Sequence, residues 1–154
     1  MDRAVQRDSP NHPVRRSIPA ALGPPDAVYL GGPRLRGQVA LVYAARDDLP
    51  ASDLLGGAGL LLTQNRGDVD VGLVDKIVDS GVGTAQLVWV GNDVGYWFAG
   101  APHWFWYLAP DGQVIPESRR VVGNTLAWQR GDILIRIEGA ISLERALEIA
   151  HSLP

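Results

Sequence analysis

Residues Thr125 to Leu153 read TLAWQRGDILIRIEGAISLERALEIAHSL and carry signals for two strands, a tight turn and a helix in immediate succession. Along Ile133 to Glu138 apolar and polar side chains alternate, so we expect a strand with one covered face and one partly wet face. Ser142 is suited to cap a helix that starts at the next residue. The expected apolar stripe of that helix consists of Leu143, Ala146, Leu147, Ala150 and Leu153. A helix with such a stripe predicts a C-terminal cover for a sheet.

Short apolar runs separated by turn residues extend this pattern back to residue 38. Val39 to Ala44 and Gly59 to Thr63 are apolar on both faces, which predicts central strands. Val71 to Val78 fits a short helix slightly better than a strand. The expected hairpin strands are Ala85–Val90 with Val94–Ala99, His103–Ala109 with Gln113–Ile115, and Thr125–Gln129 with Ile133–Glu138. We therefore expect an α+β fold, mainly a curved antiparallel β-sheet built as a meander of hairpins, covered by the C-terminal α-helix.

The length of 154 residues suits one domain, and the chain has no cysteine for disulfides or thiolate metal sites. Residues 1–26 are rich in Pro and Arg and have no apolar period, which predicts a flexible arm or linker. Residues 27–154 form the expected single sheet-plus-helix domain. We see no apolar run long enough for a signal or membrane segment, so we expect membrane attachment only through an anchor absent from this chain.

The charge is distributed unevenly along the chain. Residues 1–36 hold six Arg and three Asp, a net charge of +3, so the net charge of -3 leaves -6 for the remainder. An acidic body binds polyanions poorly, and we expect no nucleic-acid partner. The sequence has no phosphate-binding loop, nucleophile elbow or zinc-binding helix motif, so we expect neither an enzyme nor a metal or cofactor. The acidic positions Asp68, Asp70, Asp75 and Asp79 lack the order of a calcium loop and predict a solvated face.

The most unusual composition lies between Gly95 and Leu108, GYWFAGAPHWFWYL, which holds three of the five Trp residues. Strand alternation divides its last part into two sets, His103, Phe105 and Tyr107 against Trp104, Trp106 and Leu108. One set could form an exposed aromatic platform, although ordinary burial of both sets between sheet and helix is the favoured alternative. The candidate binding residues are Trp97, His103, Trp104, Trp106 and Tyr107. His103 has no adjacent Ser or carboxylate, so a structural role is favoured over a catalytic one or a proton-sensitive switch.

Several short motifs in this region carry a family resemblance. They are Gly95-Tyr96-Trp97, Gly100-Ala101-Pro102-His103, Asn124-Thr125-Leu126-Ala127-Trp128, Arg136-Ile137-Glu138-Gly139 and the closing run from Ala146 to Leu153, with Leu22-Gly23-Pro24 near the start. Their order resembles a bacterial family of extracytoplasmic domains of unknown function, found in membrane-anchored anti-sigma-factor-like proteins. The resemblance implies a sensor or regulatory module outside the cytoplasm that binds a protein partner or an envelope ligand, with no catalytic residues to transfer. The alternative is a carrier that encloses a hydrophobic ligand between sheet and helix. The sequence leaves the oligomeric state open.

Overall fold

The computed structural model describes residues 17–31, 38–66, 84–99, 103–108 and 114–154, with the backbone alone for 103–108 and 114–122. The predicted helix at Val71–Val78 and the acidic positions Asp68 to Asp79 lie outside these ranges. Within them, the expected strands and the C-terminal helix are confirmed. The elements are β1 (Ala27–Leu30), β2 (Val39–Tyr43), the 3-10 helix η2 (Asp53–Leu55), β3 (Leu60–Arg66), β4 (Thr84–Val90), β5 (Asp93–Ala99), β6 (His103–Leu108), β7 (Val114–Val122), β8 (Thr125–Arg130), β9 (Ile133–Gly139) and α2 (Leu143–His151).

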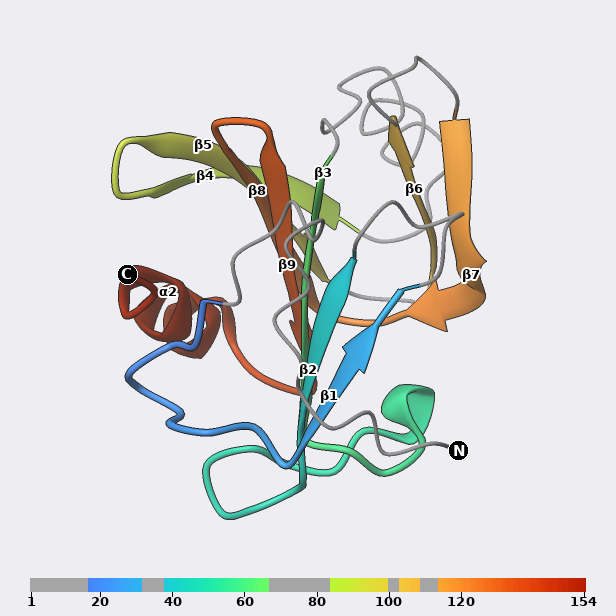
Figure 1. The fold of residues 1–154 in the computed structure, drawn as a ribbon, viewed down its shortest axis with the longest axis vertical. Coiled ribbons are helices and arrows are strands. Elements are labelled where there is room, and N and C mark those ends of the chain that lie inside the picture. Colours follow the sequence, from blue (N-terminus) through green and yellow to red (C-terminus); the bar gives the residue numbers. More distant parts are fainter. Residues whose placement is uncertain (1–16, 32–37, 67–83, 100–102, 109–113) are drawn as a thin grey trace.

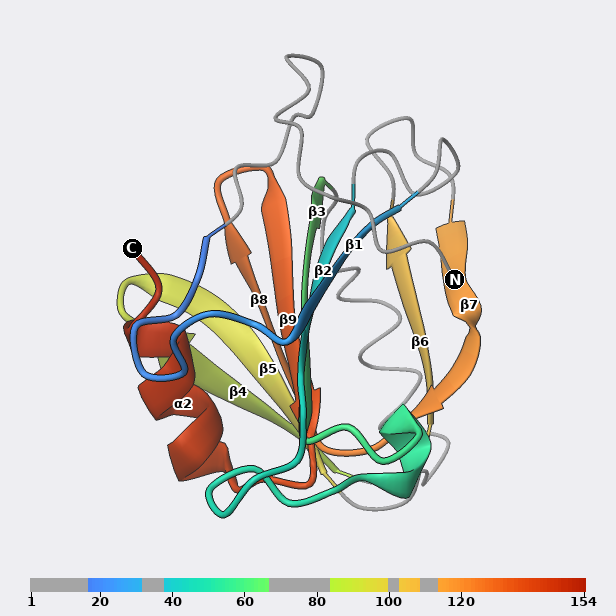
Figure 2. The same ribbon diagram turned by 60° about the horizontal axis from the view of Figure 1, so that its bottom comes forward.

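Seven of the described strands form one curved antiparallel sheet in the order β1-β2-β3-β9-β8-β5-β4 (Figure 1). Helix α2 covers one face of this sheet, and the β6–β7 pair lies on the opposite side (Figure 2). The predicted α+β class, a mainly antiparallel sheet under a C-terminal helix, is therefore confirmed. The strands do not follow chain order, because β3 pairs with β9 and β5 pairs with β8.

The face of the sheet toward α2 carries the hydrophobic core. Its centre is a row of paired side chains that crosses five neighbouring strands: Leu41, Leu62, Ile137, Leu126 and Trp97. These side chains share one face because each strand contributes every second residue. From α2, Ala146, Ile149 and Ala150 are buried against them, while Leu143 and Leu147 pack at the margin. The predicted helix stripe is thus the second half of this core.

The face turned away from α2, here called the far face, differs from the prediction. We expected a partly wet face along β9, but Arg136 and Glu138 are only 3% and 2% exposed. Their opposite charges meet, with Arg136 Nη2 2.5 Å from Glu138 Oε1. The alternation of β9 was correct, but β9 lies in the middle of a sheet with elements on both sides (Figure 2). A buried ion pair satisfies what would otherwise be two isolated buried charges.

Residues 17–26, which belong to the predicted N-terminal arm, contact both the sheet and α2. Ser17 and Gln64 form two hydrogen bonds with each other, and the backbone N–H of Ala21 donates to Ser152 Oγ at a distance of 3.0 Å. Leu22 is buried in the core. This segment is held by hydrogen bonds and by irregularly spaced apolar side chains, since Ile18 and Ala21 pack against the core beside Leu22, so it has no regular apolar face.

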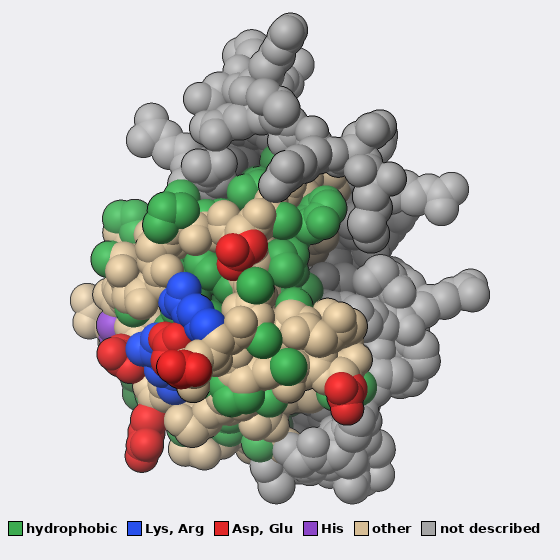
Figure 3. Space-filling view, turned by 90° about the horizontal axis from the view of Figure 1, so that it is seen from below, with side chains coloured by type: hydrophobic (Ala, Val, Ile, Leu, Met, Phe, Trp, Pro, Cys, Tyr) green, Lys and Arg blue, Asp and Glu red, His purple; other side chains and the backbone are tan. Residues whose placement is uncertain are grey.

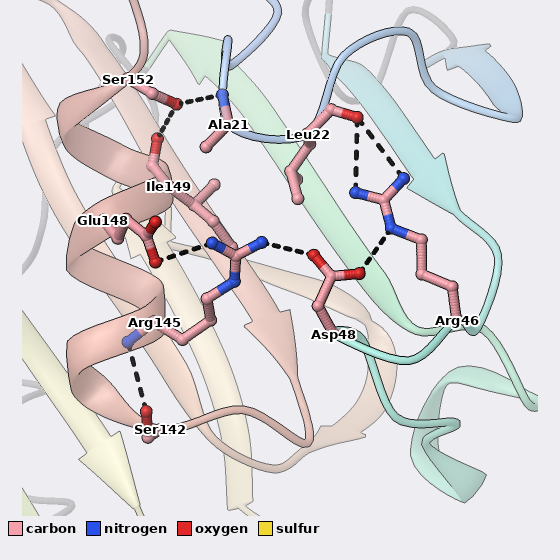
Figure 4. Close-up of polar contacts among 9 residues, drawn as sticks. All are labelled: Ala21, Leu22, Arg46, Asp48, Ser142, Arg145, Glu148, Ile149 and Ser152. Carbon is pink, nitrogen blue, oxygen red and sulfur yellow. Dashed lines mark hydrogen bonds and ion pairs between the residues drawn. The ribbon is translucent and has the colours of Figure 1, made fainter.

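A network of charged side chains joins α2 to the loop after β2. Arg145 pairs with Glu148 on its own helix at 2.7 Å and with Asp48 at 2.5 Å, and Asp48 also pairs with Arg46 at 2.9 Å (Figure 4). The Ser142 hydroxyl accepts the Arg145 N–H, which confirms the predicted helix cap. Figure 3 shows basic and acidic side chains intermixed on this face of the molecule.

Two pKa values in this network are shifted. Hydrogen bonding to Glu148 raises the pKa of Arg145 despite partial desolvation, and the charges of Glu148 and Asp48 act in the same direction. For Asp48, desolvation raises the pKa, but the hydrogen bond and charge of Arg46 together with Arg145 bring it below its ordinary value. Both shifts favour the charged forms that hold α2 against the sheet.

Candidate functional site

The β4–β5 hairpin forms one end of the main sheet, and its turn lies beside the C-terminal end of α2 (Figure 1). Its two strands are joined by a two-residue turn, Gly91-Asn92, closed by the pair Val90 and Asp93. Gly91 has a φ of 62°, a left-handed conformation that suits a glycine in a hairpin turn. The Gly91 N–H also donates to Nε2 of His151 at 3.3 Å, which ties the turn to the end of α2.

Four side chains on the far face of this hairpin form an exposed apolar group, here called the hairpin patch. Leu87 and Trp89 of β4 are 56% and 59% exposed, and Val94 of β5 is 39% exposed. Tyr96 is half-buried. The pairing sets Trp89 opposite Val94 and Leu87 opposite Tyr96, so the four residues form a two-by-two block on one face.

The far-face residues of β4 are apolar, but this face of the strand is not covered. Val88 and Val90 point toward α2 and are buried in the core. The alternate residues Leu87 and Trp89 point the other way, where they remain open to solvent. A Trp and a Leu that are both more than half exposed on adjacent positions of one face are typical of an interaction surface.

Gly95, two residues after the turn-closing Asp93, holds β5 close against β8. It lies opposite Trp128, and a Cβ atom built on it would be 2.9 Å from Trp128 Cβ and 3.0 Å from the Ala127 carbonyl oxygen. Such distances are shorter than real Cβ contacts, so only glycine allows β5 to lie this close to β8. The position of the hairpin patch therefore depends on Gly95.

The sequence-predicted binding residues fall into two groups. Trp97 belongs to the helix-side core and is only 7% exposed, so it packs the interior and presents no ring to a partner. His103, Trp104, Trp106 and Tyr107 lie on β6, and their side chains are outside the described residues. The pairing of β6 with β7 shifts register between Trp104 and Trp106, where β6 advances by two residues and β7 by five, from Val121 to Pro116.

The buried Arg136–Glu138 pair is the other group whose chemistry could serve a function. Its side chains are almost inaccessible in this conformation, so a substrate has no route to them without movement. Across the described ranges, no three His, Asp or Glu side chains are placed to hold a metal ion. The pair is therefore a structural feature of the far face.

The sequence analysis missed Leu87, Trp89, Val94 and Tyr96 as a surface. The available signal was the alternate set Ala85, Leu87 and Trp89, which is wholly apolar, whereas the other set includes the polar Gln86. Which set is exposed depends on the place of β4 at the sheet edge, and that place follows from the long-range pairing of β5 with β8.

Comparison of the chain with family models, curated proteins and solved structures finds no match. In the part of the chain that the structure describes, no helix has the length and apolar character needed to cross a membrane.

Proposed function

We propose that this chain is a non-catalytic binding domain of the extracytoplasmic sensor or regulatory type, which binds a protein partner through the hairpin patch. The observation that carries the proposal is the exposure of Leu87 and Trp89, both above one half, beside Val94 on the same face. Contiguous exposed apolar groups mark interaction sites, and Trp and Tyr are enriched among residues that dominate binding energy.

The geometry of the hairpin supports recognition by a preformed surface. Its turn is anchored by His151, and the close approach of Gly95 to β8 holds the adjoining part of β5, so the patch belongs to a packed body. A patch that is already rigid loses little conformational entropy on binding. The extracytoplasmic and regulatory part of the proposal rests on the family resemblance of the motifs between Gly95 and Leu153.

The alternative function, a carrier that encloses a hydrophobic ligand between sheet and helix, has less support. A carrier needs a cavity of roughly 300 Å³ or more between sheet and helix. The described side chains at that place, such as Leu62, Ile137 and Ile149, are fully or almost fully buried and belong to one contiguous cluster. This packing favours a surface binder over an internal carrier.

Site-specific photo-crosslinking in the cells that naturally make the protein tests the proposal. A photoreactive amino acid at Val94 samples the hairpin patch, and the same amino acid at Leu54 of η2 samples another exposed apolar position. We expect a discrete adduct with another protein at Val94 and none at Leu54. A further probe at Trp106 tests whether the aromatic residues of β6 extend the binding surface.

A second substitution in the same protein controls for specificity. Trp89→Lys should abolish the Val94 adduct, because a charge replaces the largest ring of the patch, while Leu54→Lys should leave the adduct unchanged. Identical adduct patterns at Val94 and Leu54 would contradict the proposal. An adduct between two copies of this chain does not count in its favour.

A further inference from the structure

The outer edge of β4 is a row of backbone groups that no described strand pairs with. Strand β4 ends the sheet, with β5 on its inner side. A two-residue hairpin turn is closed by a hydrogen-bonded pair, here Val90 and Asp93, and such pairs then alternate along the ladder. The N–H and C=O groups of the intervening residues Ala85, Leu87 and Trp89 therefore point outward from the sheet.

This edge has none of the usual features that prevent strands from pairing. Natural edge strands are commonly short, carry Lys or Pro, or are twisted away by a bulge. Strand β4 reads TAQLVWV over seven residues, without a charge or a proline, and it pairs with β5 in unbroken register. The opposite edge strand, β1, has only four residues. An open and uncharged edge of this length is suited to pairing with another strand.

We infer that the occupant of this edge is a second copy of the chain, whose β4 pairs antiparallel with the first across a two-fold axis at Leu87. This register sets Leu87 opposite the second copy's Leu87, and Ala85 opposite the second copy's Trp89. The largest side chain of the strand thus lies beside the smallest on the same face. About six backbone hydrogen bonds form between the outward-pointing groups.

Charge also favours a second copy. In a two-fold pairing, a charged residue at or next to the axis would lie near its own like charge in the partner, which destabilises the pair. Strand β4 has no charged residue on either face. The helix-side pair of Gln86 with the second copy's Val88 is uncharged as well.

The dimer joins the two hairpin patches into one surface. Residues opposite each other in an antiparallel ladder share a face, so Leu87 and Trp89 of both copies lie on the same side of a continuous sheet. The result is a symmetric apolar surface with the two-fold axis at its centre. The pairing stands on the edge of β4 alone and does not require the proposed protein partner.

Sedimentation equilibrium of the full chain tests the inference. We expect the 16.6 kDa chain to reach twice that mass reversibly. Because a single strand pair is a small interface, the expected Kd is on the order of 10 µM. Leu87→Lys and Leu87→Glu should each weaken the dimer by about tenfold or more, since like charges then meet on the axis. An equimolar mixture of the two variants should restore dimers that contain one copy of each.

The matched control is Leu30→Lys, an identical change at an exposed leucine of the other edge strand, which should leave the dimer intact. A wild-type monomer at about 1 mM, far above the expected Kd, would overturn the inference. So would a dimer that tolerates Leu87→Lys, or variants that fail to associate when mixed. If the chain is a monomer but still gives the Val94 adduct, the dimer is contradicted and the proposed function is supported. If the chain is a dimer but gives no Val94 adduct with another protein, the dimer is supported and the proposed function is contradicted.

Discussion

Removing one partner of the Arg136–Glu138 pair should destabilise the protein strongly, whereas replacing both partners should not. With the two side chains 3% and 2% exposed, Glu138→Leu removes the carboxylate that faces the Arg136 guanidinium in the interior. Breaking a buried pair in this way costs about 3–5 kcal/mol. Replacing both residues, as in Arg136→Met with Glu138→Leu, removes both charges and is often neutral or stabilising.

Urea denaturation measures the difference. With an m value of about 2 kcal/mol/M, the single substitution should lower the urea midpoint by about 1.5–2.5 M, and the double substitution should recover most of that loss. The half-exposed pair of Arg130 and Asp93 provides the control, because Arg130→Met should cost about 1 kcal/mol or less. Additive effects of the Arg136 and Glu138 substitutions would refute the reasoning, since additivity indicates that the two charges do not interact.

Three further predictions concern packing, position and pH. Trp128→Ala should lower the free energy of unfolding by about 3–5 kcal/mol, because that ring is fully buried. Trp89→Ala should change it by about 0.5 kcal/mol or less, because that ring is exposed. Urea denaturation measures both values. Gly95→Ala should lower the free energy of unfolding by about 1–3 kcal/mol, because the added Cβ would meet the backbone of β8. Thermal melting should show a lower Tm, and an unchanged Tm would contradict this prediction. The stabilising contribution of Asp48 should be present above pH 3.8 and lost as the pH falls through its lowered folded-state pKa. Melting curves of Asp48→Asn should therefore converge with wild type in acid, and parallel curves would contradict the shift.

Much of the fold could be predicted from local patterns. The alternation of β9 and the stripe of α2 required only the periods of strand and helix, and both were confirmed. The hairpin turn at Gly91 was similarly visible because turn residues separate two apolar runs. These signals act over a few neighbouring residues, which is the distance over which sequence patterns are informative.

The candidate site could not be predicted in this way. Trp97 and Trp89 are both aromatic residues on apolar strands, yet Trp97 is buried and Trp89 is exposed. The difference follows from the face that α2 covers and from the place of β4 at the sheet edge. Likewise, the sequence places Arg136 opposite the apolar face of β9 but does not show that the far face is covered. Both facts depend on contacts between distant segments.

The account rests on an exposed apolar hairpin that stands out from a closed sheet-and-helix core, and hydroxyl-radical footprinting tests this directly. The protein is oxidised briefly in its native state, and mass spectrometry quantifies the oxidation of each tryptophan. We expect rapid oxidation of Trp89, with Trp97 and Trp128 strongly protected until the protein unfolds. Protection of Trp89 equal to that of Trp128 in a dilute, monomeric sample would contradict the account.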